Sequence, residues 1–257
     1  MLVEVTRPFG RKLVPKTTIL LSVVFFFISL PSESAAQQRK FSRNYPAGRL
    51  VRLTLTNKSG MVTVIGWDRP EINISATLES PAAVIAPQNL SGDIVINLVR
   101  DNSNRDVGSV NFVIRVPFTT EVDIQTLMGN LIVSNIRSSF VRARVSTDGD
   151  IELTNIGSGN VIAENGIGNI FYDGDLHEGG IYRFSSMQGT INLRIPFTSS
   201  FKLVATAPST RNIMLGPFNN GDMNQIGDGR RIIGKFGTGA ANLNVTNQRG
   251  SIFFVRR

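Results

Sequence analysis

Two short acidic clusters are the first features of this sequence that could do chemistry. They read DGDIE at residues 148–152 and DGD at residues 173–175. Calcium is the cation that such clusters could hold, because it binds several oxygen ligands from flexible loops. Neither cluster matches the twelve-residue helix–loop–helix pattern or the glycine-rich nonapeptide that binds calcium. We therefore predict solvated carboxylates with no cofactor and no metal, and calcium stays the alternative.

Paired carboxylates, or a carboxylate beside a basic residue, could also cleave a polysaccharide. Asp148 and Asp150 lie about one repeat before Asp173, and Arg142 and Arg144 alternate along the run that precedes them. These five residues are the one candidate surface cluster that the sequence offers. Charges of both signs also keep the outer face of a sheet soluble. We therefore predict no catalytic residues and no enzyme, with a polysaccharide-acting enzyme as the alternative.

Composition restricts the chemistry further. The chain has 257 residues, of which 41% are hydrophobic and 18% charged, so it is neither disordered nor a coiled coil. It has no cysteine and one histidine, His177. A disulfide framework, thiolate catalysis and a cysteine zinc site are therefore excluded, and most histidine-based acid–base pairs are disfavoured.

The N-terminus has the pattern of an export signal. Residues 1–16 are basic, residues 17–30 are apolar, and the small residues of SAA at 34–36 precede Gln37. This pattern predicts a secretory signal peptide over residues 1–36. The apolar run is shorter than the ~20 residues of a membrane-spanning helix, so an uncleaved membrane anchor is only the alternative. We expect an exported protein of the periplasm, the cell surface or the medium.

Charge points to the kind of partner. Removal of residues 1–36 takes away four basic and two acidic residues and leaves a net formal charge of +6. The favoured interpretation is a solvated basic surface with no dedicated partner, and a surface that meets anionic lipid or envelope polysaccharide is the alternative. Export disfavours nucleic acid, and a membrane contact is expected only through an uncleaved signal segment.

A glycine-marked motif repeats along the chain. The marker glycines, which we predict to be structural turn residues, are Gly60, Gly92, Gly129, Gly149, Gly168, Gly189 and Gly250. Each has Asn, Ser or Thr three residues before it and apolar residues two and four residues after it. Glycine supplies a positive φ angle, the polar side chain can bond the turn backbone, and the alternation is that of a half-buried strand.

The spacing of these glycines predicts the architecture. From Gly129 the intervals are 20, 19 and 21 residues, and no segment after residue 36 shows helical periodicity. A steady period with two short strands per repeat favours an all-β, single-stranded β-solenoid, similar to a parallel β-helix, over an antiparallel sandwich. We predict one domain over 37–257, irregular at 37–118 and regular at 119–257, with a long loop at 216–239.

A solenoid with this period makes predictions for single columns of residues. One continuous buried column should contain Leu131, Ile151, Ile170 and Ile191. Their outward neighbours, which we expect to be ordinary surface positions, are Asn130, Asp150, Asn169 and Thr190. Asn135 and Asn155 recur at the same spacing and should form a polar ladder at one corner.

Several short motifs resemble a known family. They are YPAG at 45–48, NKSG at 57–60, GWDRP at 66–70, VP at 116–117, STDGDI at 146–151 and NQRGSI at 247–252. Over roughly residues 45–257 the chain resembles the bacterial exported domains of unknown function named "putative adhesin". The resemblance implies a β-solenoid-like fold and brings no catalytic residues with it.

Together these features predict a non-catalytic interaction or structural protein of the cell envelope or surface. Its sheet faces and the segment 216–239 would contact a protein or an envelope polysaccharide, because a stacked sheet is wide and rigid. A polysaccharide-acting enzyme and a periplasmic sensing or regulatory domain remain the alternatives.

Overall fold

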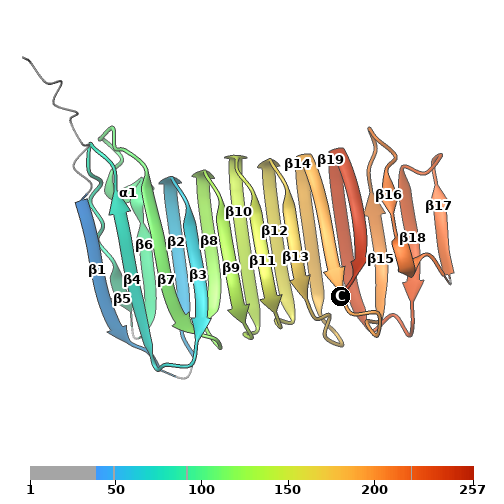
Figure 1. The fold of residues 1–257 in the computed structure, drawn as a ribbon, viewed down its shortest axis with the longest axis horizontal. Coiled ribbons are helices and arrows are strands. Elements are labelled where there is room, and N and C mark those ends of the chain that lie inside the picture. The colour runs from blue at the N-terminus through green and yellow to red at the C-terminus, as the bar shows by residue number, and fades with distance from the viewer. Residues whose placement is uncertain (1–38, 49, 91, 221) are drawn as a thin grey trace, which may run out of the picture. The chain divides into compact units, whose positions relative to one another are not determined.

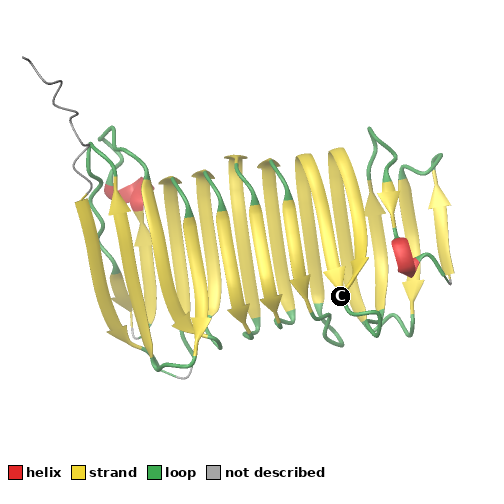
Figure 2. Cartoon of the chain, in the orientation of Figure 1, coloured by secondary structure: helices red, strands yellow, loops and turns green. Residues whose placement is uncertain are grey.

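The protein is all-β. The computed structural model describes residues 39–48, 50–90, 92–220 and 222–257, so the predicted signal peptide lies outside the described residues. Helical structure among the described residues is limited to the single turns α1 (Leu98–Asp101) and η1 (Gly216–Phe218) (Figure 2). The predicted all-β class is therefore confirmed.

The strands form one 19-stranded sheet, in which the long strands β14 and β19 join two hydrogen-bonded ladders that we call ladder 1 and ladder 2 (Figure 1). In spatial order ladder 1 contains β5 (Gln88–Leu90), β6 (Asp93–Asn97), β2 (Arg52–Ser59), β8 (Glu121–Met128), β10 (Phe140–Asp148), β12 (Asn160–Ile167), the first halves of β14 (Ile181–Ile195) and β19 (Ala241–Arg256), β15 (Phe201–Thr206), β18 (Arg231–Phe236) and β17 (Asp222–Ile226).

Ladder 2 contains the other strand of each of the same repeats. In spatial order it contains β1 (Arg39–Pro46), β4 (Glu71–Leu78), β7 (Val110–Pro117), β3 (Val62–Trp67), β9 (Leu131–Ile136), β11 (Ile151–Ile156), β13 (Ile170–Gly174), the second halves of β14 and β19, and β16 (Ile213–Met214). Each ladder is open, because its two outermost strands are paired on one side only within the described part of the chain.

The core lies between the inner faces of the two ladders. Residues alternate between inward and outward along each strand, and the inward residues of both ladders form one hydrophobic cluster. Ile151 pairs in parallel register with Leu131 on one side and Ile170 on the other, and Ile170 pairs with Ile191. All four are at most 1% exposed, so the predicted buried column is present. The same parallel pairing rules out an antiparallel sandwich for these strands.

The corner between the two ladders is built from the marker glycines. Six of the seven have a positive φ angle, and Gly250 does not. A Cβ atom on Gly149 would lie 2.3 Å from the carbonyl oxygen of Gly129, and one on Gly250 would lie 1.7 Å from that of Gly189. Apart from Gly92, whose Cβ position is open, the marker glycines are therefore needed for close backbone contact with a neighbouring strand or turn.

Polar side chains on both sides of this corner join the repeats. Inside, the amide of Asn165 donates to the carbonyl of Gly149 at 2.8 Å. Outside, the backbone N–H of Asn169 donates to the Asp150 carboxylate at 2.6 Å, and that of Thr190 donates to Asn169 at 2.9 Å. The expectation of ordinary surface positions is therefore wrong for Asn130, Asp150 and Asn169, because their side chains accept hydrogen bonds from backbone donors of the next repeat.

At the opposite corner an asparagine ladder is present as predicted. The Asn155 amide donates to the Asn135 side-chain oxygen at 2.8 Å, and both residues have left-handed φ angles of 54° and 59°. Asparagine tolerates this conformation better than most residues because its short side chain can hydrogen-bond locally.

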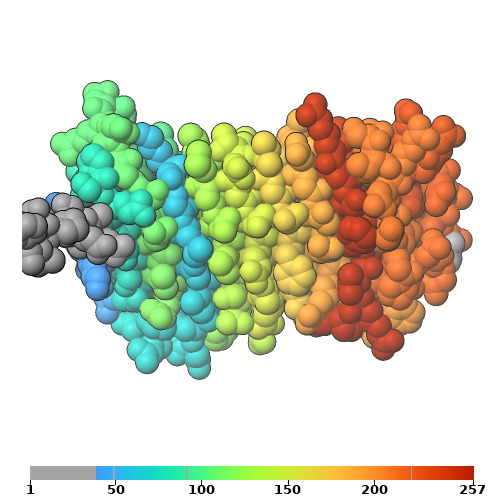
Figure 3. Space-filling model, turned by 45° about the horizontal axis from the view of Figure 1, so that its top comes forward, coloured from blue at the N-terminus to red at the C-terminus, as the bar shows by residue number. Residues whose placement is uncertain are grey.

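The chain order along the stack differs from the spatial order near both ends. β2 and β3 lie between the β6–β7 pair and the β8–β9 pair. The C-terminal strand β19 lies between β14 and β15, and in Figure 3 its red band separates strands that precede it in the sequence. Neither insertion can be deduced from the glycine spacing, which records only neighbours along the chain.

Two predicted irregular segments contain regular structure. Within 216–239, β17 and β18 form an antiparallel hairpin that extends ladder 1, so the prediction of a long loop is wrong. The turn of this hairpin uses left-handed residues at Gly227, Asp228 and Gly229. Within 37–118, β4 and β5 are antiparallel to their neighbours, but β2, β3, β6 and β7 continue the parallel ladders.

Candidate binding face

The outward side chains of ladder 1 form a continuous surface that we call face 1. Its two ends differ in how their charges are matched. Over β2, β8, β10 and β12, cations and carboxylates alternate from strand to strand and pair with each other. Over β14, β19, β15 and β18, cations predominate and line a groove.

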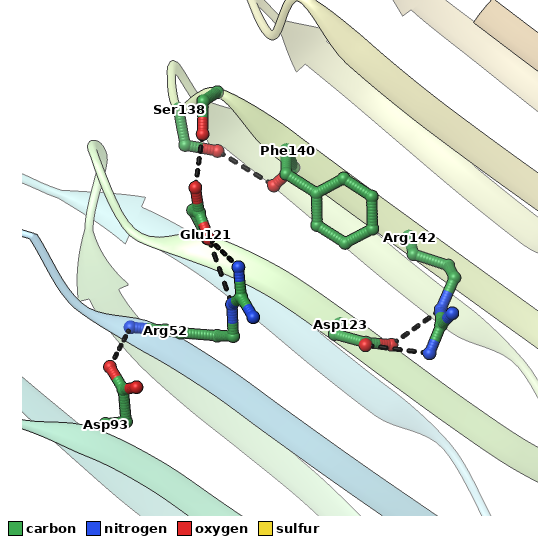
Figure 4. A network of polar contacts seen from close by, with 8 residues as sticks. Arg52, Asp93, Glu121, Asp123, Ser138, Phe140 and Arg142 are labelled. Atoms are coloured by element: carbon green, nitrogen blue, oxygen red, sulfur yellow. Dashed lines mark hydrogen bonds and ion pairs between the residues drawn. The ribbon is translucent and has the colours of Figure 1, made fainter.

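The first ion pair of face 1 joins β2 to β8 (Figure 4). The guanidinium Nε of Arg52 lies 2.9 Å from Oε2 of Glu121, and the hydroxyl of Ser139 donates to Oε1 of Glu121. The hydrogen bond from Ser139, followed by that from Arg52, lowers the pKa of Glu121. The backbone N–H of Arg52 also donates to Asp93 at 3.0 Å, so β6 is tied to the same network.

Two further pairs continue across face 1. Arg142 on β10 donates from Nε and Nη2 to the two carboxylate oxygens of Asp123 on β8, both at 2.8 Å (Figure 4). Such a two-pronged contact fixes the orientation of both side chains. Nε of Arg144 lies 3.7 Å from Glu164 on β12. At this end of face 1, Arg52, Arg142 and Arg144 are therefore neutralised by carboxylates of the protein itself.

The groove lies at the other end of face 1. It has a volume of about 660 Å³ and lies across β14, β19, β15 and β18. Its polar walls carry Arg183, Lys202, Lys235, Asn242 and Asn244, all of which are exposed. Ile181, Val204 and Ile233 supply its apolar surface, and Asp222 lies at its far rim.

The structure does not bring the predicted surface cluster together. Arg142 and Arg144 lie on face 1, whereas Asp150 and Asp173 belong to the strands of ladder 2 or their turn. Asp148 ends β10 at the glycine corner. Residues one period apart occupy the same position on adjacent strands of one ladder. Residues in a turn, or on the other strand of the repeat, lie on a different surface of the protein.

Asp173 has its own pair of cations at the outer surface of ladder 2. Nη2 of Arg194 lies 3.2 Å from one carboxylate oxygen, and Nη1 of Arg257 lies 3.7 Å from the other. Arg257 also contacts Asp175 at 2.5 Å. These contacts hold Arg257 against Asp173 and Asp175 at the end of β13. We therefore interpret the ion pairs of Asp173 as structural.

Sequence reasoning missed the groove residues. Arg183 comes from β14, Lys202 from β15, Lys235 from β18 and Asn242 from β19, and these strands are adjacent only because β19 is inserted and β18 turns back. The available signal was the polar outward position on each of these strands. That signal does not say which strands are neighbours.

The described residues contain neither a cluster of metal-binding side chains nor a membrane-spanning helix. No group of three or more His, Cys, Asp or Glu residues in this part of the chain could hold a metal ion. No helix among residues 39–48, 50–90, 92–220 and 222–257 has the length and hydropathy to cross a bilayer.

Comparison with known proteins places the fold but not the activity. No family model and no curated protein matches the chain. A "putative cell adhesion protein" from Clostridium sporogenes is 10% identical, with a TM-score of 0.54 over 86% of this chain and 100% of that chain. A "putative adhesin" from Bacteroides fragilis is also 10% identical, with a TM-score of 0.33 over 85% of this chain and 97% of that chain.

At this identity the first likeness shows a shared fold, and the second is too weak to carry an argument. The resemblance of the sequence motifs to adhesin-like domains is therefore supported at the level of the fold alone.

Proposed function

We propose that this protein is an exported, non-catalytic binding protein of the cell envelope or surface, and that face 1 contacts its partner. The observation that carries the proposal is the network of ion pairs on the outer surface of ladder 1. Arg52, Glu121, Asp123 and Arg142 are held by hydrogen bonds to one another before any partner arrives. Preorganised side chains lose less conformational freedom on binding, which favours affinity.

We interpret the stacked strands as a β-solenoid with two ladders. The parallel registers of β9, β11 and β13, each offset by one repeat, support this interpretation. Solenoids present wide surfaces that grow with the number of repeats and commonly serve as binding platforms. The shared fold with a protein described as a cell adhesion protein agrees with such a role.

Export is the part of the proposal that residues 1–36 support, through their basic, apolar and small-residue segments. The test is cell fractionation of the source organism followed by N-terminal sequencing of the recovered protein. We expect envelope or extracellular protein that begins near Gln37. Soluble cytoplasmic protein that retains Met1 would overturn export.

Binding through face 1 can be tested with two matched bulky substitutions. Ser185 points outward from ladder 1, and Ser134 points outward from ladder 2. We expect labelled protein to bind saturably to isolated envelopes of the source organism, Ser185→Trp to weaken this binding, and Ser134→Trp to leave it unchanged. Absence of saturable binding would overturn the proposed function, and equal binding by both variants would overturn the assignment to face 1.

A further inference from the structure

The groove on face 1 runs across the strands between two rows of outward side chains. One row contains Ile181, Asn242, Lys202 and Lys235, which pair in register across β14, β19, β15 and β18. The second row, two residues further along, contains Arg183, Asn244, Val204 and Ile233. Four strands at their usual spacing separate the outer two by about 14 Å, which suits an extended ligand lying across the strands.

The cations of the groove are mostly without a carboxylate partner, unlike Arg52, Arg142 and Arg144 at the other end of face 1. Lys202 and Lys235 are direct cross-strand partners, an arrangement of like charges that opposes sheet pairing. Among the described residues, no carboxylate lies within 4 Å of Lys202 or Arg183. Lys235 has one exposed contact, 3.8 Å from Asp222. Both arginines of β10, by contrast, are matched by carboxylates, so the groove is the part of face 1 that is suited to an anionic ligand.

The neutral residues of the groove further restrict the chemical class of the ligand. Asn242 and Asn244 lie at the centre of the two rows, and in the described structure neither side chain is hydrogen-bonded to another residue. Each amide offers donors and an acceptor, which is what a hydroxyl-bearing ligand requires. Ile181 and Val204 flank them, and Ile181 is 50% exposed. Cationic, amide and aliphatic side chains are therefore neighbours within each row of the groove.

We infer that the groove binds an acidic polysaccharide, a glycan that carries uronate carboxylates. The carboxylates would lie against Arg183 and the pair Lys202 and Lys235, the ring hydroxyls against the two asparagine amides, and the C–H faces of the rings against Ile181 and Val204. This inference rests on the proposed function, because it names the chemical class of the partner of face 1.

An acidic peptide fits the groove less well. An extended peptide binds a sheet chiefly through backbone hydrogen bonds at an open edge. The strands below the groove are already paired with their neighbours on both sides, from β12 through β14, β19, β15 and β18 to β17. The groove therefore offers side chains and not free backbone groups.

The test measures binding of the full chain to polygalacturonate, to neutral dextran, to polyglutamate and to anionic lipid vesicles by affinity electrophoresis or calorimetry. We expect binding to polygalacturonate that weakens with salt, and little binding to the other three. The triple variant Arg183→Gln, Lys202→Gln and Lys235→Gln should lose at least tenfold in affinity. Because all three positions are exposed, we expect the variant to fold, and a melting curve would verify this.

The matched control removes three charges at the other end of the stack. Lys40, Arg105 and Arg115 have no ion pair among the described residues and lie outside face 1, and the triple change of these residues to glutamine alters net charge equally. We expect affinity within twofold of the unchanged protein. Equal losses in both variants, or groove-dependent binding of polyglutamate or vesicles at the same affinity, would overturn the inference. If the triple groove variant still binds isolated envelopes as the unchanged protein does, the groove is not the site of binding. The proposed function as an envelope-binding protein would then still hold.

Discussion

At the scale of single residues, the marker glycines do more than turn the chain. Gly149 and Gly168 have φ angles of 145° and 127°, and a Cβ atom on either would lie within 2.3 Å of the carbonyl of the preceding marker glycine. Strain in the turn and a clash with the neighbouring repeat therefore act together. Gly159 differs, since its Cβ position is open and its φ angle is not positive.

We predict that Gly149→Val lowers the free energy of unfolding by more than about 1 kcal/mol, through strain and displaced backbone rather than lost contacts. Urea denaturation would measure the change. The matched substitution Gly159→Val should stay within about 0.5 kcal/mol of the unchanged protein, as at ordinary surface positions. Equal effects at the two sites would refute the close-contact interpretation.

The outward asparagines of the same corner are also structural. We predict that Asn169→Ala costs about 0.5–1.5 kcal/mol, because the backbone N–H of Thr190 loses its acceptor. Asn192 lies on the outward face of the next strand, and no hydrogen bond of its side chain is found in the described residues. Asn192→Ala is thus the control, and thermal melts in which it costs as much as Asn169→Ala would count against the bond.

Glu121 gives a pH-dependent prediction. Its pKa is lowered in the folded protein by Ser139 and Arg52, so its stabilising effect is present above the ordinary carboxyl pKa of 4.5 and is lost as pH falls through the folded pKa. We expect Glu121→Gln to melt below the unchanged protein at pH 7, and the difference to shrink at pH values below 4.5. A difference that does not depend on pH would exclude the ionised carboxylate as its cause.

At the scale of elements, the β17–β18 hairpin converts a glycine-rich segment into one wall of the groove. It does so at a cost, because β18 places Lys235 directly beside Lys202 of β15. Like charges in this position destabilise a strand pair. The position of this like-charge pair inside the groove is the electrostatic feature on which the proposed anion-binding site rests.

We predict that Lys202→Gln raises the free energy of unfolding by about 0.2–1 kcal/mol, since it removes the repulsion across the β15–β18 pair. The gain should shrink in concentrated salt, which screens exposed charges. Denaturant curves at low and high salt would measure both effects. Lys58→Gln, on β2, is the comparison and should change little; a loss of stability in Lys202→Gln would contradict the prediction.

At the scale of the whole molecule, the end of the sequence lies in the interior of the ladders. β19 pairs with β14 along its whole length and with β15 and β16 on its other side. β19 therefore joins β14 to β15 and the hairpin beyond it. Its aromatic residue Phe254 packs with Phe201 and Phe218, which close that end of the core.

We predict that a chain lacking residues 241–257 shows no cooperative thermal transition, because the contacts between β14 and β15 run through the missing strand. A synthetic peptide of residues 241–257 should restore the transition when added in trans. Removal of Arg256 and Arg257 alone is the control and should leave a cooperative melt. Cooperative unfolding of the longer truncation without peptide would show that β19 is dispensable.

The sequence by itself determined the local features of this fold. Glycine spacing and apolar alternation predicted the strands, the parallel column from Leu131 to Ile191 and the asparagine ladder at Asn135 and Asn155, because each depends on neighbours one period apart. It also indicated an all-β class with an irregular N-terminal part, where antiparallel strands are found.

Only the tertiary structure decided which distant strands are neighbours. The insertion of β19 between β14 and β15, and the hairpin that returns β18 to β15, bring Arg183, Lys202, Lys235 and Asn242 into one groove. The predicted cluster of Arg142, Arg144 and three aspartates is dispersed for the same reason, because facing and strand order are set by long-range pairing. Sequence periodicity predicts which strands are neighbours when they follow one another along the chain. The outer face of the sheet also depends on pairing between strands that are far apart in the sequence, such as β14 and β19.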